Sequence, residues 1–257
     1  MKILTLYFSG TGNTAYLATQ FSHKMQARCL SIEADADFDA AIKAHDTIAF
    51  CYPIYMSNPP RIMREFVARH TEAIRGKKVI IFCTQWLLSG DGARRFAALF
   101  PPGHVQVVYA AHFFMPNNMN DLPFLPISRG KGIEKYRART ERKLARVCQD
   151  IEAGRVKRRG FGVLGRLLGL PQSAFLGATE RRANHAVSID KDCNMCGVCV
   201  KACPTGNFFI EDGAVKLWGD CTMCYRCINS CPKKAVRVLV NGKVKRQYGG
   251  MGCAGGN

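Results

Sequence analysis

A doubled cysteine pattern constrains this chain more than any other feature of its sequence. Each copy has three Cys separated by two residues, a fourth Cys after three further residues, and then Pro. The two copies start 28 residues apart and together hold eight of the 13 Cys in the 257-residue chain. In a chain that is not exported, so many closely spaced thiols indicate bound metal rather than disulfides. The copies comprise Cys193, Cys196, Cys199 and Cys203, then Cys221, Cys224, Cys227 and Cys231.

The spacing within each copy favours an iron–sulfur cluster. Three closely spaced thiolates bind three iron corners of one 4Fe–4S cubane, and the fourth Cys reaches the cubane of the other copy. Zinc is the competing interpretation, but zinc ribbons are built from paired CxxC knuckles. We therefore expect two 4Fe–4S clusters that exchange their fourth ligands. The first cysteine set is Cys193, Cys196, Cys199 and Cys231, and the second cysteine set is Cys221, Cys224, Cys227 and Cys203.

Residues 184–240, which contain both copies, resemble the two-cluster bacterial-type ferredoxins. The resemblance implies a small α+β domain with two pseudo-symmetric halves. The potentials of such clusters depend on thiolate ligation, hydrogen bonds to sulfur and burial.

The N-terminal part of the chain alternates apolar runs with helical patterns. Its runs predict buried strands, and segments between them have the spacing of amphipathic helices. This alternation indicates an α/β fold, a doubly wound parallel sheet of five strands. Ligands of such sheets bind beyond the carboxyl ends of the strands, which here lead into loops 9–14, 53–59 and 85–92. The expected strands cover residues 2–8, 28–33, 46–53, 77–84 and 104–113.

The loop after the first strand favours a bound phosphate. Its glycines let the backbone approach a ligand, and N–H groups at the start of the next helix attract an anion. It lacks the Lys of a Walker A loop. As a G-x-G-x-x-A motif it would bind a dinucleotide, with Glu33 near the ribose, whereas as a hydroxyl-rich cradle it would bind the phosphate of FMN. The loop comprises Ser9, Gly10, Thr11, Gly12, Asn13 and Thr14.

Residues 1–153 resemble the flavodoxin family in this loop and in two further loops at the same edge of the sheet. The resemblance implies FMN, which we favour over a dinucleotide. Aromatic or flat side chains of the two further loops would then cover the flavin ring. The expected cofactor-binding residues outside the first loop are Pro53, Ile54, Tyr55, Met56, Ser57, Gln85, Trp86, Leu87 and Gly90.

Positive charge is concentrated in the middle of the chain. The formal net charge is +18, of which residues 127–182 carry +10, residues 1–126 carry +3 and residues 183–257 carry +5. Such an excess attracts acidic partners or anionic surfaces. Residues 155–177, basic and then apolar, would suit peripheral contact with an anionic membrane. Their glycines disfavour a stable helix, so a linker is the interpretation we prefer.

The composition changes along the chain predict four segments. These are a flavodoxin-like FMN-binding domain at 1–153, a basic and apolar linker at 154–183, the two-cluster domain at 184–240, and a Gly-rich tail at 241–257, whose last nine residues, 249–257, we expect to be mobile. The N-terminus lacks the cleavage site of a signal peptide, and no run of 18 apolar residues occurs. We therefore expect a cytoplasmic chain without a transmembrane helix.

The complete pattern resembles the flavodoxin–ferredoxin fusion proteins of anaerobic bacteria and archaea. This implies an electron-transfer protein that relays electrons between FMN, two 4Fe–4S clusters and a redox protein partner, which the positive charge predicts to be acidic. The alternative is an FMN-dependent oxidoreductase that reduces a small substrate with electrons from the clusters. Its only candidate general acids are Tyr55 and Asp91, so we favour the carrier and assign no catalytic residue. No nucleic-acid-binding motif is present.

Overall fold

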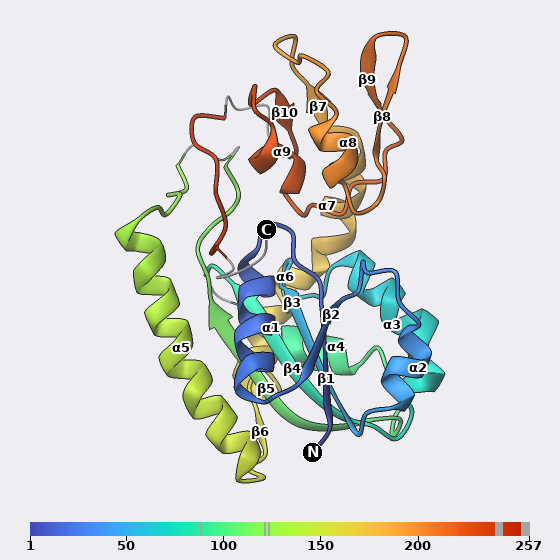
Figure 1. Ribbon diagram of the computed structural model, residues 1–257, viewed down its shortest axis with the longest axis vertical. Coiled ribbons are helices and arrows are strands. Elements are labelled where there is room, and N and C mark those ends of the chain that lie inside the picture. Colours follow the sequence, from blue (N-terminus) through green and yellow to red (C-terminus); the bar gives the residue numbers. More distant parts are fainter. Residues whose placement is uncertain (88, 121, 123, 240–243, 253–257) are drawn as a thin grey trace.

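The N-terminal part of the chain forms a parallel sheet of six strands in the order β2-β1-β3-β4-β5-β6 (Figure 1). The computed structural model describes residues 1–257 except 88, 121, 123, 240–243 and 253–257. The first five strands have the order of flavodoxin-like sheets, which places β1 and β3 at the point where the winding reverses. The strands are β1 (Ile3–Tyr7), β2 (Arg28–Ser31), β3 (Thr47–Pro53), β4 (Lys78–Gln85), β5 (Gln106–Phe114) and β6 (Lys157–Arg158).

Helices cover both faces of the sheet, because its central strands are apolar on both sides. One face packs α1 (Asn13–Lys24) and α5 (Lys131–Glu152) around a core that includes Phe82. The opposite face packs three helices around a core that includes Phe50. Those three helices are α2 (Phe38–Lys43), α3 (Arg61–Ile74) and α4 (Gly92–Ala97).

The sixth strand was not expected. β6 is only two residues long and pairs in parallel with β5, with Lys157 opposite Tyr109. A short basic segment gives no apolar signal of a strand, yet charged residues are common on sheet edges because they discourage further pairing. The doubly wound α/β fold was predicted correctly, and the number of strands was one too low.

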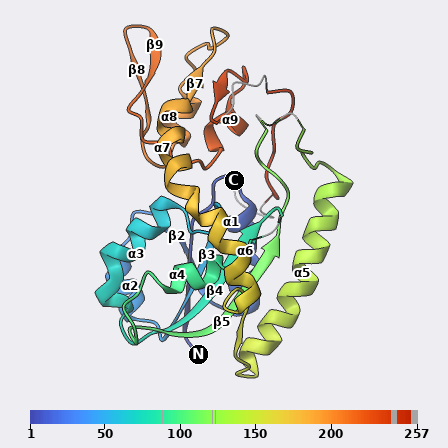
Figure 2. The same ribbon diagram turned by 180° about the vertical axis from the view of Figure 1, so that it is seen from behind.

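The segment expected to be a linker contains two helices. α6 spans Val163–Ala174 with Pro171 inside it, and α7 spans Leu176–Ala186. Seen from behind, the two helices form one path from β6 to the C-terminal part (Figure 2). The expectation that glycines prevent a helix here was wrong, because these glycines serve close packing, as described below. The boundaries of the four segments stay a prediction.

The C-terminal part is small and lies beyond the carboxyl ends of the sheet strands (Figure 1). Strands β7 (Ser188–Ile189) and β10 (Val236–Arg237) pair in an antiparallel manner, as do β8 (Phe208–Glu211) and β9 (Ala214–Leu217). Two five-residue helices, α8 (Val198–Ala202) and α9 (Arg226–Ser230), begin 28 residues apart, which is the period of the cysteine pattern. The expected internal repeat is therefore present in the backbone.

The last described residues pack against the flavodoxin-like part, although a mobile tail was expected. Met251 is fully buried in the core beneath α1 and α5. The Arg137 guanidinium donates to the Met251 carbonyl, and the Tyr248 hydroxyl donates to Asn13 Oδ1 at 2.5 Å. A flexible apolar side chain such as Met fills an irregular gap well. The expected mobility was wrong for residues 249–252, while Cys253 and the remaining tail lie outside the described residues.

Within the described residues, no helix is both long and apolar enough to cross a membrane.

Candidate cofactor sites

The two cysteine loops share an unusual backbone geometry. Left-handed φ angles recur at the 28-residue period: Met195 and Met223 both have φ of 54°, while Gly197 at 74° corresponds to Tyr225 at 60°. A third pair, at positions 206 and 234, behaves in the same way. Left-handed backbone at non-glycine residues costs free energy and persists where the surroundings require it. Both loops therefore curl in the same way around their cysteines.

The fourth cysteine of each copy lies beside the other copy. Burial raises the pKa of Cys224 to about 12 and raises that of Cys227 well above its ordinary value, and the nearby Cys221 and Cys203 add to both shifts. Cys203 is therefore a neighbour of the second copy. Burial likewise raises the pKa of Cys199, to which Cys193 and Cys231 contribute. These neighbourhoods are the ones that exchanged fourth ligands require.

Backbone N–H groups point at several of the cysteine sulfurs. The Met195 and Met223 amides donate to the sulfur two residues earlier, at 3.5 and 3.4 Å. The Ala235 amide donates to Cys231 Sγ at 3.3 Å, and the Asn207 amide donates to Cys203 Sγ at 3.4 Å. Such hydrogen bonds favour the thiolate form and tune the potential of a bound cluster. In the described part of the chain, no three Cys, His, Asp or Glu side chains gather as ligands of a single ion.

A cavity of about 470 Å³ opens at the carboxyl ends of β1, β3 and β4. All three expected loops line it. Of the 15 expected cofactor-binding residues it collects 13, and only Gly12 and Gly90 are not among the lining residues. Those 13 are Ser9, Gly10, Thr11, Asn13, Thr14, Pro53, Ile54, Tyr55, Met56, Ser57, Gln85, Trp86 and Leu87.

A second group of lining residues has no signature in the sequence. The segment 115–119 after β5 closes one side, and Gln172 and Thr179 reach the cavity from α6 and α7. Met223 and Tyr225 line it from the second cysteine loop. These residues come from distant parts of the chain, so only the folded arrangement brings them together.

The phosphate loop keeps only part of its expected donors free for a ligand. Gly12, with φ of 94°, precedes α1, and no side chain in the described residues caps this helix. Its first N–H groups therefore remain available to an anion. The Asn13 amide donates to the Pro116 carbonyl at 2.9 Å, and the Thr14 hydroxyl pairs with that of Thr84 at 2.7 Å. The hydroxyls of Ser9 and Thr11 act only as acceptors within the described residues, so each retains its proton for a ligand.

Gln85 presents an unused acceptor at the cavity. Its Nε2 donates to the Leu87 carbonyl at 2.7 Å, while Oε1 is buried without a hydrogen-bond partner among the described residues. A buried acceptor left unpaired costs about 1–3 kcal/mol. A ligand N–H in the cavity would remove that cost, so the lining fits a flat heterocycle with a donor edge.

Tyr55 connects the cavity with the second cysteine loop. It lines the cavity and packs against the buried cluster that contains Met223, against which Cys221 packs as well. Burial raises the pKa of Tyr55 well above its ordinary value, with Cys224 and Cys221 adding to the shift. The ring therefore lies between the expected flavin site and the second cysteine set as a neutral phenol.

Arg226 joins the phosphate loop to the C-terminal part. Its guanidinium donates to the carbonyl oxygens of Gly10 at 3.1 Å and Ser9 at 2.9 Å. It also pairs with Glu33 at 2.8 Å, so the acid considered for a ribose serves this contact instead. A Cβ on Gly10 would lie 2.2 Å from the Cys224 carbonyl oxygen, which explains why the loop needs glycine there.

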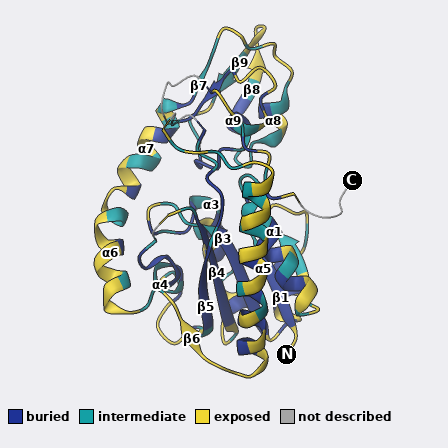
Figure 3. Cartoon of the chain, turned by 90° about the vertical axis from the view of Figure 1, so that its left-hand side faces the viewer, coloured by how far each residue is buried: buried dark blue, intermediate teal, exposed yellow. Residues whose placement is uncertain are grey.

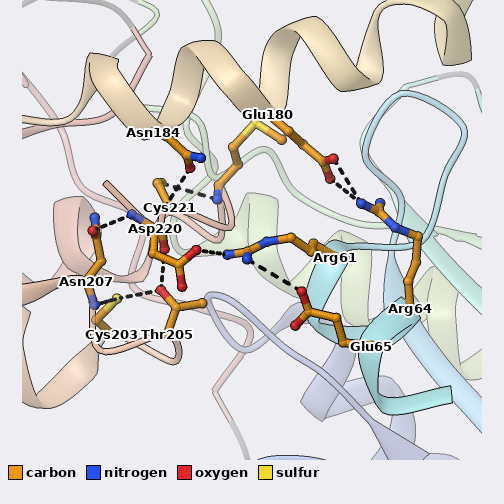
Figure 4. A network of polar contacts seen from close by, with 11 residues as sticks. Arg61, Arg64, Glu65, Glu180, Asn184, Cys203, Thr205, Asn207, Asp220 and Cys221 are labelled. Carbon is orange, nitrogen blue, oxygen red and sulfur yellow. Dashed lines mark hydrogen bonds and ion pairs between the residues drawn. The ribbon is translucent and has the colours of Figure 1, made fainter. Parts of the chain in front are cut away.

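Helix α3 holds the C-terminal part through a second polar network (Figure 4). Arg61 pairs with Asp220 at 2.5 Å, and Arg64 pairs with Glu180 of α7 at 2.9 Å. Thr205 donates to the Asp220 carbonyl at 2.5 Å and lies 3.4 Å from Cys203 Sγ. Asp220, next to Cys221, and Thr205, beside Cys203, are thus tied to the sheet domain through Arg61.

Asp91 does not belong to the cavity. It is fully buried and pairs with Arg94 and, at 3.1 Å, with Arg95. Its carboxylate is therefore occupied by two guanidinium groups of α4 and does not line the cavity. One of the two candidate general acids for a substrate-reducing enzyme is thereby removed.

Comparison with known families identifies both parts of the chain. Residues 4–121 match the family model described as a flavodoxin domain. Residues 191–206 and 218–241 match the model described as a 4Fe-4S binding domain. The chain is therefore a fusion of a flavodoxin domain and a ferredoxin-type 4Fe–4S domain, in that order.

Several solved structures resemble the N-terminal part. The two-electron reduced flavodoxin of Megasphaera elsdenii is 20% identical, with 43% of this chain and 84% of that chain covered and a TM-score of 0.38. The WrbA-like flavodoxin of Agrobacterium tumefaciens is 19% identical (60% and 99% covered, TM-score 0.41). General stress protein 14 of Treponema denticola, in complex with FMN, is 13% identical (60% and 99% covered, TM-score 0.44). No curated protein matched the chain.

Proposed function

We propose that the protein is an electron carrier that holds FMN in the cavity and two 4Fe–4S clusters on the two cysteine sets. The observation that carries this proposal is the shared wall of the cavity. Loops of the flavodoxin domain form most of it, and Met223 and Tyr225 of the second cysteine loop contribute to it. Two sites that share a wall are suited to exchange electrons directly.

We assign the phosphate of FMN to the loop at 9–14 and the ring to the space between loops 53–57 and 85–87. The first N–H groups of α1 and the hydroxyls of Ser9 and Thr11 would hold the phosphate. Gln85 Oε1 would accept from a ring N–H. Asn13 and Thr14 act indirectly, because their side chains hold the loop to neighbouring segments.

We infer an order of electron transfer from the positions of the two cysteine sets. FMN supplies one- or two-electron chemistry when bound, and each cluster supplies one-electron chemistry. Cys224 lies against Gly10, so the second cysteine set is proximal to the flavin site. Cys196 of the first cysteine set is exposed, which makes that set the distal end of the relay.

A basic stripe on α5 offers a docking surface for an acidic redox partner. Its exposed side chains recur at steps of three and four residues, and they make no ion pair within the described residues. Charge complementarity of this kind accelerates encounter and is weakened by salt. The stripe comprises Lys131, Lys135, Arg139, Arg142 and Arg146.

The carrier is favoured over the substrate-reducing oxidoreductase on the lining of the cavity. Asp91 is absent from that lining, and burial keeps Tyr55 neutral through its raised pKa. A general acid works best when its pKa lies near the working pH. A phenol whose pKa is strongly raised does not meet this condition. A cytoplasmic location and an anaerobic host stay predictions from the sequence.

The decisive experiment is metal and flavin quantitation on protein purified without oxygen. We expect eight iron atoms and one FMN per chain. Cys221→Ser should remove about half of the iron, whereas Cys51→Ala, a buried Cys outside the pattern, should leave all of it. Zinc in place of iron, or no FMN at saturating flavin, would overturn the proposal.

A paired substitution tests the flavin assignment. Thr11→Val removes a hydroxyl from the phosphate loop and should weaken FMN binding by about 10- to 100-fold, as expected for a hydrogen bond to a charged group. Thr19→Val makes the same change on the exposed side of α1 and should leave the affinity unchanged. Equal effects of the two substitutions would place the phosphate elsewhere.

A further inference from the structure

Helix α6 packs with its glycines inward and its leucines outward. A Cβ on Gly169 would lie 1.8 Å from Asp91 Oδ1, and a Cβ on Gly90 would lie 2.3 Å from the Gly169 amide. A Cβ on Gly165 would approach the Gly90 carbonyl oxygen to 3.2 Å. The side of α6 that carries Gly165 and Gly169 therefore lies almost backbone to backbone against the loop before α4.

The opposite side of this helix exposes large apolar side chains. Helices of globular proteins normally bury such residues, and contiguous exposed apolar surface marks an interaction site. Figure 3 shows most of α6 as exposed surface on the outside of the molecule. Six side chains in this region have exposed fractions between 41% and 72%. Together they form what we call the leucine face, which comprises Val163, Leu164, Leu167, Leu168, Leu170 and Phe175.

The fold holds α6 in this orientation. Gln172 accepts a hydrogen bond from Ser57 at 2.7 Å, and Ser173 accepts one from Arg95 at 2.5 Å. Both contacts lie near the C-terminal end of the helix, while the glycines fix its middle. These contacts hold α6 in one orientation, so the leucine face is a defined part of the surface of the folded protein.

Basic side chains flank the leucine face in the sequence, in β6 before α6 and in α7 after it. Residues 155–182 contain seven Lys or Arg and a single acid, Glu180, which pairs with Arg64. Arg155 and Lys157 pair with Asp150, and the others form no ion pair within the described residues. These others are Arg158, Arg159, Arg166, Arg181 and Arg182.

We propose that α6 and the start of α7 form a surface that binds an anionic lipid membrane. Leucines on one side of a helix, with Lys and Arg beside them, are typical of helices that lie in the membrane interface. The apolar side chains would enter the acyl boundary, and the guanidinium groups would contact lipid phosphates. The 12-residue helix would lie flat, with its glycine face still on the protein.

Charge distinguishes this occupant from the other candidates. A second copy of the chain would bring two strongly basic segments together, which like-charge repulsion opposes. An acidic protein would match the charge, but it would need its own apolar surface to cover the leucines. An anionic bilayer supplies both components in one surface.

Vesicle co-sedimentation of the full chain tests the proposal. The wild-type protein should bind vesicles of phosphatidylglycerol and phosphatidylcholine, bind pure phosphatidylcholine at least ~10-fold more weakly, and lose affinity at high salt. The double variant Leu164→Asn with Leu167→Asn should lower the partition coefficient by ~10-fold or more. The double variant Arg158→Glu with Arg159→Glu should lower it on anionic vesicles only.

A matched control distinguishes binding through this surface from non-specific adsorption to vesicles. Ile210→Asn also replaces an exposed apolar side chain, in the β8–β9 hairpin, and should bind anionic vesicles like the wild type. No binding of the wild type to anionic vesicles would overturn the proposal, as would an equal loss in the control. Self-association in sedimentation velocity that the Leu164 and Leu167 substitutions abolish would instead assign this face to a second copy.

Discussion

The Arg226 guanidinium donates hydrogen bonds to both carboxylate oxygens of Glu33, at 3.0 and 2.8 Å. The pair spans 193 residues and joins α9 to the loop after β2. The same guanidinium holds the Gly10 carbonyl, so one side chain fixes the second cysteine loop on the phosphate loop. The proposed contact between the flavin and the proximal cluster depends on this attachment.

Removing this ion pair should loosen the contact between the two domains. We expect Glu33→Gln to destabilise the folded protein by about 1–3 kcal/mol, because the partly buried guanidinium loses a charged partner. Urea unfolding followed by tryptophan fluorescence would measure the loss. Glu72→Gln, which breaks the exposed pair with Arg75, should cost less than about 1 kcal/mol. A Glu33 variant as stable as the control would contradict the proposed attachment.

The C-terminal residues should contribute measurably to stability. Met251→Ala removes a fully buried side chain from the core beneath α1 and α5, and should cost about 2–4 kcal/mol. The same unfolding assay serves, with Val156→Ala at an exposed position as the control. A cost below about 1 kcal/mol would mean that the tail does not pack as described.

Acid should destabilise the protein through His112. Burial lowers the pKa of His112 to about 4, with Arg159 and Lys143 adding to the shift. In the unfolded state the His112 side chain has a pKa near 6.5. Between pH ~4 and pH ~6.5 the unfolded state therefore binds a proton that the folded state does not bind. The free energy of unfolding is therefore not lowered by His112 above pH ~6.5. Below that pH it falls by about 1.4 kcal/mol per pH unit, down to pH ~4.

His112→Phe should remove this component of the pH dependence. The free energy of unfolding, measured at several values between pH 4 and 7, should fall less steeply for the variant than for the wild type. His23→Gln changes an exposed His on α1 and should leave the slope unchanged. Parallel curves for the wild type and the His112 variant would show that another group dominates.

The sequence was most informative where spacing alone determines chemistry. The cysteine pattern predicted the internal repeat, because cluster ligands leave little freedom in their separation. The apolar runs predicted five strands, because burial on both sides leaves a continuous signal. The three loops expected to bind a ligand line the cavity for the same reason, since they follow those strands directly.

Features that depend on distant contacts could not be predicted. The glycines of α6 lower its intrinsic helix propensity, yet Gly169 is required there by the close approach of Asp91. The tail was expected to be mobile because no local pattern reveals that Met251 fills a gap beneath α1 and α5. Residues 115–119 and Tyr225 reach the cavity only through the arrangement of the two domains.

The close packing of α6 predicts opposite effects of the same substitution at two glycines. Gly169→Ala places a methyl group into Asp91 and should destabilise the protein by about 1–3 kcal/mol through overpacking. Gly177→Ala in α7 meets only the far end of the Arg181 side chain, at 3.5 Å, and should stabilise by up to about 1 kcal/mol through higher helix propensity. Thermal unfolding of both variants measures the difference. If Gly169→Ala were also neutral or stabilising, α6 would not pack against Asp91, and its leucines would be free to turn inward.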